Sequence, residues 1–316
     1  MPNTLTRKVS WTIPRRPLGA HMSIAGGIDL AIERGASIGC TAIQLFTKST
    51  SQWAARPLPD DEVGRFKAAR VRSGIASVMA HDSYLINLCS PDDALWEKSV
   101  EACHLELQRC ERLGIETLVV HPGGHMGQGE DFGVRRLAQA IDVIHARLPG
   151  GGASIALETM AGQGTVIGHR FGQLSRTIAL TSDPERVGVC LDTCHVFAAG
   201  YALRTKTAYG ETMREFEGEI GLRRLRAVHV NDSKRELGSR VDRHEHIGKG
   251  CLGLDAFRLL MTDPRLEHLP LVLETPKDEK TLKEDVLNLN TLIGLAAPEG
   301  VRRRAMAARV AAGGRA

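Results

Sequence analysis

Histidine, aspartate and glutamate residues stand at the ends of several apolar runs in this sequence. In "GVCLDTCHVFAAG", the apolar residues 188–191 are followed at once by Asp192 and, three residues later, by His195. Such groups in one place would repel or desolvate one another unless metal cations compensate them. The other residues in comparable positions are His21, His81, Asp82, His121, Glu158, His229, Asn231, Asp232, Asp242, His244, His246 and Glu274.

Taken singly, each of these residues is more simply explained as a hydrogen-bonded core residue or a helix cap. Taken together, they favour Zn²⁺ or Mn²⁺, and the large share of histidine favours Zn²⁺. The candidates are too many for the four or five ligands that one ion takes, so two or three ions fit better. Clustered metals of this kind are typical of phosphodiester hydrolysis.

Eight short apolar runs alternate with eight amphipathic patterns, which predicts how these residues are positioned. We expect strands at residues 19–24, 42–47, 77–82, 117–122, 154–159, 187–192, 226–231 and 270–275. We expect helices at residues 29–39, 61–74, 94–114, 133–148, 172–182, 211–221, 254–261 and 280–295. Apolar rather than alternating strands indicate a parallel sheet, so the prediction is an α/β fold, a single (β/α)8 TIM barrel with its site at the carboxyl ends of the strands. An open doubly wound sheet is the alternative.

Composition describes an ordinary globular protein. Of 316 residues, 42% are hydrophobic and 25% charged, and no apolar run is long enough to span a membrane. The first twenty residues are basic but lack the apolar centre of a secretory signal. The seven cysteines form no CxxC pair and are odd in number, which favours a reducing compartment. We therefore expect a cytoplasmic protein.

Positive charge is concentrated at the two ends of the chain. Residues 1–18 and 301–316 contain nine Lys and Arg and no acid, which leaves 32 basic against 37 acidic residues between them. We expect a flexible extension at 1–18, one catalytic domain at 19–296 and a disordered tail at 297–316. Such ends add solubility, and they can also add sequence-independent affinity for nucleic acid.

Nine motifs carry a resemblance to a known family over residues 19–293. They are "GAHMSIAGG", "LFTKSTSQW", "HDSYLINL", "HPGGH", "LETMAGQG", "GVCLDTCHVFAAGY", "HVNDSK", "GSRVDRHEHIGKG" and "LVLETP". Together they resemble the endonuclease IV family of metal-dependent apurinic/apyrimidinic endonucleases. The resemblance implies a TIM barrel with three zinc ions at its C-terminal face, with Mn²⁺ as a substitute at one site.

The resemblance also implies a distribution of nine ligands. His81, His121 and Glu158 would hold the first ion. Glu158 would bridge to the second ion, which also takes Asp192, His229 and Glu274. The third ion would be held by His195, Asp242 and His244.

The reaction implied by the resemblance is hydrolysis of double-stranded DNA on the 5′ side of an abasic site, leaving a 3′-hydroxyl and a 5′-deoxyribose phosphate. Water ionised by the metals would attack the phosphorus in line. Glu274 would orient or deprotonate that water, and Glu158 would share in the catalytic site. The family also trims blocked 3′ ends. We expect a monomer, because DNA needs an open face.

The same resemblance implies which residues meet DNA. Tyr84 and Leu85 match a wedge that enters the base stack beside the flipped abasic nucleotide. The remaining residues expected at the DNA interface are His21, Lys48, Gln52, Trp53 and Arg243. One departure is Ser51, which stands where the family commonly has an arginine that enters the duplex. Affinity or DNA distortion is therefore expected to differ, while the metal chemistry is not.

Two other functions fit parts of the pattern. A sugar isomerase or epimerase would use a similar barrel with one or two ions, and a non-catalytic binder of damaged DNA would be expected to lack one or more ligands. The nine matches and "HDSYLINL" argue against both. Cys190 and Cys194 are interpreted as small packing residues rather than metal or redox groups.

Overall fold

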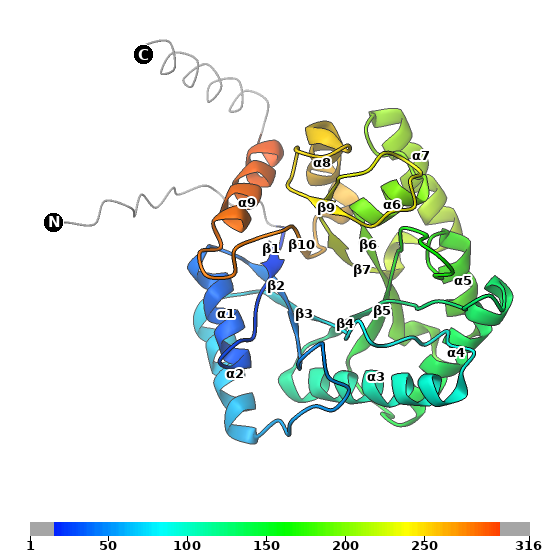
Figure 1. The fold of residues 1–316 in the computed structure, drawn as a ribbon. Helices are drawn as coiled ribbons and strands as arrows, with labels where there is room; N and C mark the ends of the chain where they lie inside the picture. Colours follow the sequence, from blue (N-terminus) through cyan, green and yellow to red (C-terminus); the bar gives the residue numbers. More distant parts are fainter. Residues whose placement is uncertain (1–15, 298–316) are drawn as a thin grey trace, which may run out of the picture.

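The computed structural model describes residues 16–297, and these form a closed barrel of parallel strands surrounded by helices (Figure 1). The barrel strands are β1 (Leu18–His21), β2 (Ala42–Phe46), β3 (Ser77–His81), β4 (Thr117–Val120), β5 (Ser154–Glu158), β6 (Val187–Asp192), β7 (Leu225–His229) and β10 (Leu271–Leu273). They follow chain order around the barrel, and β10 closes it against β1, with Leu18 opposite Leu271. The predicted (β/α)8 barrel is confirmed.

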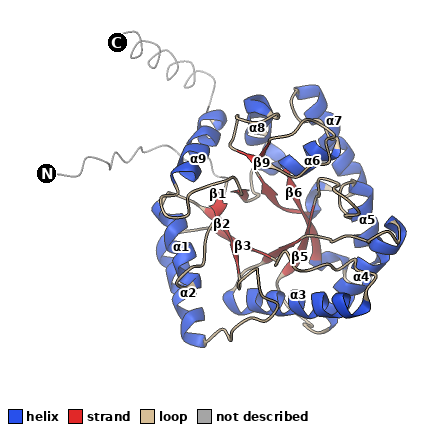
Figure 2. Cartoon of the chain, in the orientation of Figure 1, coloured by secondary structure: helices blue, strands red, loops and turns tan. Residues whose placement is uncertain are grey.

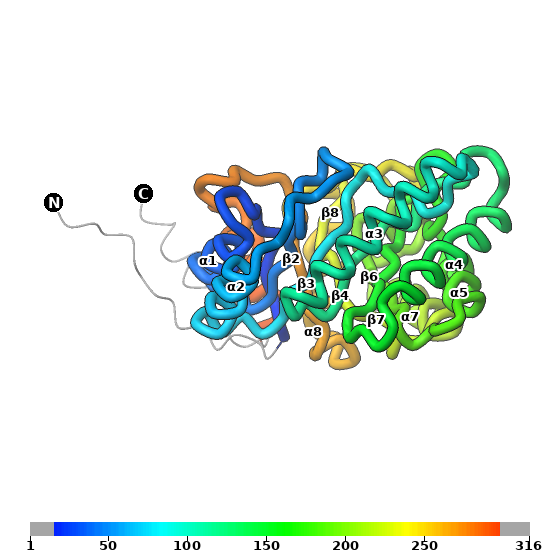
Figure 3. Tube along the Cα trace, turned by 90° about the horizontal axis from the view of Figure 1, so that it is seen from below, coloured from blue at the N-terminus to red at the C-terminus, as the bar shows by residue number. Residues whose placement is uncertain are grey.

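Helices surround the barrel, as the secondary-structure colouring shows (Figure 2), and all of them except the short, buried α6 form its outer layer. They are α1 (Ile28–Ser37), α2 (Asp60–Ser73), α3 (Asp93–Leu113), α4 (Glu130–Ala146), α5 (Phe171–Leu180), α6 (Thr193–Ala199), α7 (Lys206–Glu219), α8 (Gly253–Thr262) and α9 (Lys283–Ala296). A view turned by 90° shows α2, α3 and α4 following one another around the barrel (Figure 3). None of the helices between residues 16 and 297 is long and apolar enough to cross a membrane.

Local sequence explains where the long helices begin and end. The Asp92 side chain caps α3 by accepting the N–H of Leu95 at 2.8 Å, which satisfies one of the free donors at a helix start. Gly114 ends the same helix in the left-handed conformation that favours glycine. Helix α6 was not predicted. It is only seven residues long and buried on nearly every side, so its sequence has no amphipathic period.

The barrel interior is filled by a layer of small and medium side chains. Seven buried residues form this cluster, one from each of seven strands: Ala42, Met79, Val119, Ala156, Cys190, Ala227 and Val272. Strand β1 contributes Gly19, whose neighbours in register are Ala42 and Val272. A Cβ on Gly19 would lie 1.7 Å from the Ala42 carbonyl oxygen, so only glycine fits there. Cys190 therefore lies in the barrel filling.

The barrel begins earlier in the chain than predicted. Arg16 is buried, and its guanidinium donates to the carbonyl oxygens of Leu260 and Asp263, each at 2.7 Å. Leu18 is buried in β1. Residues 16–18 thus belong to the folded body, whereas the rest of both expected tails, apart from Ala297, lies outside the described residues.

A small antiparallel hairpin lies over the carboxyl end of the barrel. Its strands are β8 (Asp232–Ser233) and β9 (His244–Glu245). The Asp232 carboxylate is fully buried and accepts the backbone N–H groups of Ser233, Gly248, Gly250 and Leu252 at 2.8–3.0 Å. These bonds fix the segment that follows β9.

Candidate metal centre

Most of the nine expected ligands lie where barrel strands end. His81, Glu158, Asp192 and His229 are the last residues of β3, β5, β6 and β7. His121 and Glu274 directly follow β4 and β10. Since parallel strands present their carboxyl ends at one face, these side chains converge.

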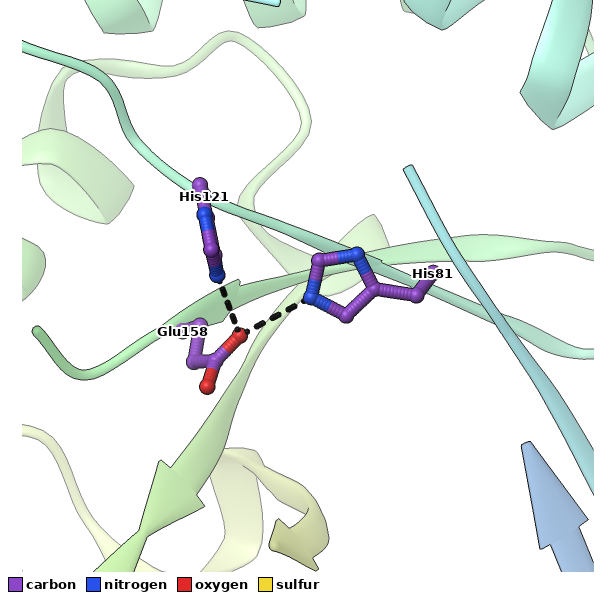
Figure 4. A group of neighbouring side chains, drawn as sticks. All are labelled: His81, His121 and Glu158. Carbon is purple, nitrogen blue, oxygen red and sulfur yellow. Dashed lines mark hydrogen bonds and ion pairs between the residues drawn. The ribbon is translucent and has the colours of Figure 1, made fainter. Parts of the chain in front are cut away.

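Glu158 lies at the centre of the convergence, and it is almost fully buried. His81 and His121 point at its Oε2, each with Nε2 at 3.1 Å (Figure 4). His195 and His229 approach its Oε1, with Nδ1 at 3.2 and 3.0 Å. The two oxygens of one carboxylate thus face different histidines, His81 and His121 at Oε2 and His229 at Oε1, which suits a carboxylate that bridges two ions.

A second group shares Glu158 with Asp192, His229 and Glu274. One ligand atom from each of the four lies within 4.8 Å of the others. His229 Nδ1 is 3.2 Å from Glu274 Oε2 and 3.8 Å from Asp192 Oδ2. Zinc ligands lie about 2.0–2.3 Å from the ion, so tetrahedral neighbours are about 3.3–3.8 Å apart. The separations fit an ion of that size.

A third group is built on α6 and on the segment that leads into β9. His195 Nε2 is 3.2 Å from Asp242 Oδ2, and His244 Nε2 is 3.3 Å from Asp242 Oδ1. Asp192 Oδ2 lies 3.7 Å from His244 Nε2, so Asp192 stands between the second and third groups. Cys194 also comes within 4.8 Å of Asp242 and His244.

In three histidines the contact made by Nδ1 leaves Nε2 as the nitrogen that would bind metal, and in His81 that Nε2 faces Glu158 Oε2 at 3.1 Å. The Nδ1 atoms of His81, His195 and His244 contact the carbonyl oxygens of Asp82, Thr159 and Glu274 at 2.9, 2.8 and 3.2 Å. If each Nδ1 carries the proton, Nε2 keeps its lone pair. Among residues 16–297, the buried Nε2 atoms of His195 and His244 have no hydrogen-bond partner, although Asp242 oxygens lie 3.2 and 3.3 Å away. This is how metal-binding histidines are oriented in proteins.

The electrostatics of the site also match a cation cluster. Burial alone would raise the pKa of Glu158, but the facing His229 and His121 hold it well below its usual value. Burial alone would lower the pKa of His195, but Asp192, Asp242 and Glu158 hold it well above its usual value. The Glu158 carboxylate is therefore held ionised inside a buried site, as a ligand for a cation must be.

Two side chains that sequence reasoning did not assign hold the ligands in place. Asn231 donates to Asp192 Oδ2 at 2.6 Å and accepts the backbone N–H of Glu274 at 2.8 Å. Gln44, buried in β2, contacts both His229 and Glu274. A polar residue inside the apolar run 42–47 was the available signal for Gln44. Asp232, noted from the sequence, supports the loop instead of the site.

The expected DNA-contacting residues are placed in different environments. Tyr84 is 64% exposed and packs beside His81 and His121, with ring centroids 5.9 and 6.0 Å apart. Leu85 next to it is half-buried. Arg243, between the ligands Asp242 and His244 in sequence, is exposed.

The loop after β2 is only partly available to a ligand. Gln52 is exposed, and Trp53 is half-buried with the Lys98 ammonium 4.5 Å from its ring centre. Lys48 is buried instead of facing solvent, and its ammonium donates to the Gln52 carbonyl oxygen at 2.7 Å and lies 3.5 Å from Glu106 Oε1. Lys48 therefore holds its own loop.

His21 lies beside the second group. It is partly buried, and its Nδ1 is 3.8 Å from Glu274 Oε1. The Lys277 ammonium donates to its carbonyl oxygen. His21 thus faces the proposed catalytic carboxylate rather than the outer rim.

Comparison with known proteins identifies the family. Residues 32–292 match the family described as Xylose isomerase-like TIM barrel. The chain is 50% identical to the protein named "Probable endonuclease 4" of Chloroflexus aggregans over 277 residues, covering 88% of this chain and 96% of that one. It is 49% identical to the protein of the same name in Geobacter sulfurreducens, covering 91% and 95%.

Solved structures agree with this comparison. Endonuclease IV from Thermus thermophilus superposes with a TM-score of 0.78 at 36% identity, covering 88% of this chain and 98% of that one. A D-tagatose 3-epimerase-like protein superposes with a TM-score of 0.66 at 17% identity, covering 88% and 98%, which shows a shared fold alone. With the sequence relatives, these matches show that the chain belongs to the endonuclease IV family.

Proposed function

We propose that this protein is a DNA-repair nuclease that cuts the backbone on the 5′ side of abasic sites and leaves a 3′-hydroxyl and a 5′-deoxyribose phosphate. The observation that carries the proposal is the gathering of nine histidine and carboxylate side chains, Glu158 among them, at the carboxyl face of the barrel. Trimming of blocked 3′ ends is proposed as a second reaction of the same site, since it breaks the same kind of bond.

Three zinc ions are proposed to fill the three groups, with Mn²⁺ as a substitute at one of them. When bound, such ions activate water at neutral pH and neutralise the charge that develops on the phosphate oxygens. His81 and His121 would hold the first, His229 and Glu274 the second, and the pair His195 and His244 the third. Glu158 would join the first two, and Asp192 and Asp242 complete the set.

Glu274 is the residue best placed to act on the attacking water. Its Oε2 faces His229 in the second group, while its Oε1 is held by the Gln44 amide at 2.6 Å. The Glu274 side chain keeps 16% of its surface exposed, so water and substrate can reach it. We assign it the orientation and deprotonation of water. Glu158, at 1% exposure, would act as a bridge.

Recognition of the damaged strand is proposed to rest on Tyr84 and Leu85. A tyrosine that is 64% exposed beside the metal groups can stack on a base next to the gap left by an abasic nucleotide. Gln52, Trp53, His21 and Arg243 stay proposed contacts around this wedge, whereas Lys48 is proposed to act indirectly by shaping its loop.

The two loops that carry these residues are joined by helix α3. Glu106 accepts the backbone N–H of Ser83 at 3.2 Å and pairs with Lys48. Ser83 Oγ donates to the Thr50 carbonyl oxygen at 2.8 Å. Arg109, one turn further along α3, donates to the Thr47 carbonyl oxygen at 2.7 Å. We infer that α3 holds the wedge and the β2 loop in one fixed arrangement.

The remaining expectations also stay proposals. We propose a monomer, because the wedge needs an open face, and we propose that it works in the cytoplasm. We propose one catalytic domain over residues 19–296, and the hydrogen bonds of the buried Arg16 support including residues 16–18 in it. We also propose that the basic residues at the two ends of the chain contact DNA phosphates.

A nicking assay on a duplex with one abasic site tests the function. We expect cleavage that a chelator abolishes and that added Zn²⁺ restores, with a 3′-hydroxyl on the upstream product. Glu274→Gln should lower kcat by at least about 100-fold, which is the typical effect of removing a general base. An enzyme that epimerises ketoses but leaves abasic DNA intact would reject the proposal. Active protein with at most one ion per chain would reject the three-metal arrangement.

A further inference from the structure

We infer that Gln44 is a positioning residue that fixes the binding orientation of two side chains of the second metal group, His229 at the end of β7 and Glu274 directly after β10. The inference rests on the proposed metal cluster. Gln44 is fully buried in β2, so it cannot itself touch DNA.

Three contacts account for the whole Gln44 amide. Its oxygen lies 2.7 Å from His229 Nε2. Its nitrogen donates to Glu274 Oε1 at 2.6 Å and lies 3.0 Å from His21 Nδ1. An amide has two N–H donors and one oxygen acceptor, so each is used once.

The orientation of this amide is determined by its partners. Turning it over would place the amide oxygen 2.6 Å from a Glu274 carboxylate oxygen, and two acceptors would then repel each other. With the amide oxygen toward His229, the Nε2 of that ring must carry the proton. His229 therefore presents Nδ1, the nitrogen that faces Glu158 at 3.0 Å and Glu274 at 3.2 Å, to a metal.

The same amide orients Glu274. The backbone N–H of Glu274 is held by Asn231 at 2.8 Å, but the side chain needs a separate restraint. Gln44 takes one carboxylate oxygen, and the other is left to face His229 in the second group. A single neutral side chain thus sets the proton position on one ligand and the rotation of another.

The strand order explains how Gln44 of β2 contacts residues at the ends of β10 and β7, which lie on the other side of β1. Strand β1 lies between β2 and β10, and its inward residue beside Ala42 is Gly19. A Cβ on Gly19 would lie 1.7 Å from the Ala42 carbonyl oxygen, so glycine lets β1 and β2 pack at this distance. Gln44 then crosses above β1 to residues 185 and 230 positions away in sequence.

The test is a comparison of zinc retention. Full-length wild type, Gln44→Met and Gln44→Leu would be titrated with chelator, and bound zinc measured by elemental analysis. Gln173→Met is the matched control, because Gln173 is also buried but its amide serves the start of α5. Losing a partner of a metal ligand typically lowers metal affinity by about 10- to 100-fold. We expect that loss for one zinc equivalent in both Gln44 variants and none in the control.

Kinetics separates positioning from general support of the fold. Because Gln44 is buried beneath the ligands, kcat on abasic duplex should fall by about 10- to 100-fold with KM unchanged. Zinc retention and kcat equal to wild type in the Gln44 variants would overturn the inference, and so would an equal loss in Gln173→Met. Wild type that binds no zinc would reject the proposed function itself. If wild type binds three ions and the Gln44 variants retain zinc equally well, the proposed function stands and only the role of Gln44 is rejected.

Discussion

Replacing Asp232 should release the segment that follows β9 and with it the third metal group. This carboxylate is completely buried and accepts four backbone N–H groups, three of them from residues 248–252. Gly250 can approach so closely only because it lacks a side chain, since a Cβ there would lie 2.4 Å from the Ser233 carbonyl oxygen.

The size of the effect follows from the number of bonds lost. A hydrogen bond to a charged group contributes about 1.5–3 kcal/mol, so three long-range bonds give an upper range of roughly 5–9 kcal/mol. Water can reach the half-buried Gly248 and Gly250 once the loop opens, which reduces the cost. We expect Asp232→Ala to lower the free energy of unfolding by about 4 kcal/mol. Asp232→Asn keeps one oxygen and should cost about half as much.

Urea denaturation measures the change in stability, and amide hydrogen exchange locates it. Faster exchange is expected at Gly248, Gly250 and Leu252, together with weaker zinc binding at His244, since β9 pairs with β8. Asp255→Asn, on an exposed surface of α8, is the control and should change stability by less than about 0.5 kcal/mol. A loss below about 1 kcal/mol in Asp232→Ala, with exchange unchanged, would refute the reasoning.

Three other changes test separate parts of the molecule. Tyr84→Ala should weaken binding to abasic duplex by about 5- to 100-fold, the range expected for one lost stacking partner, whereas the exposed Leu180→Ala on α5 should not, as fluorescence anisotropy would show. Cys194→Ala should leave zinc content unchanged, because histidine and carboxylate ligands already fill the three proposed groups and the Cys194 thiol donates to the Arg243 carbonyl oxygen at 3.7 Å; loss of one equivalent would contradict this. Burial and the nearby Arg186 lower the pKa of His145 from 6.5 to about 4, so the unfolded chain takes up a proton first as pH falls. Between pH 6.5 and 4, the free energy of unfolding of wild type should therefore fall by roughly 3 kcal/mol more than that of His145→Leu. Urea denaturation at each pH measures this difference, and an equal fall in both proteins would disprove the prediction.

Much of the fold could be predicted because each barrel strand is a short apolar run. Strand β6 has the predicted bounds, Val187–Asp192, and the other strands differ by a few residues at their ends. The short helix α6 and the β8–β9 hairpin were missed. The first has no amphipathic period, and the second has two residues in each strand.

The candidate ligands were accessible from sequence because they follow strand ends, and the resemblance sorted them into groups. Their supporting partners were not accessible in the same way. Gln44 meets His229 and Glu274 across separations of 185 and 230 residues, which no local spacing encodes. Lys48 was expected at the DNA surface, but pairing with a buried Glu106 turns it inward. Which polar side chains pair with one another depends on which buried donors and acceptors still lack a hydrogen-bond partner once the barrel has closed.

The loops that follow β2 and β3 are both attached to α3, and this has a consequence for the rate of association with DNA. Loops already held by Glu106 and Arg109 lose little conformational freedom when a duplex arrives. We therefore expect association to follow a single exponential whose rate rises linearly with DNA concentration, without a slow rearrangement phase. Cutting the attachment with Glu106→Ala, which removes the acceptor of the Ser83 N–H and the partner of Lys48, should add that slow phase before it changes the final extent of binding.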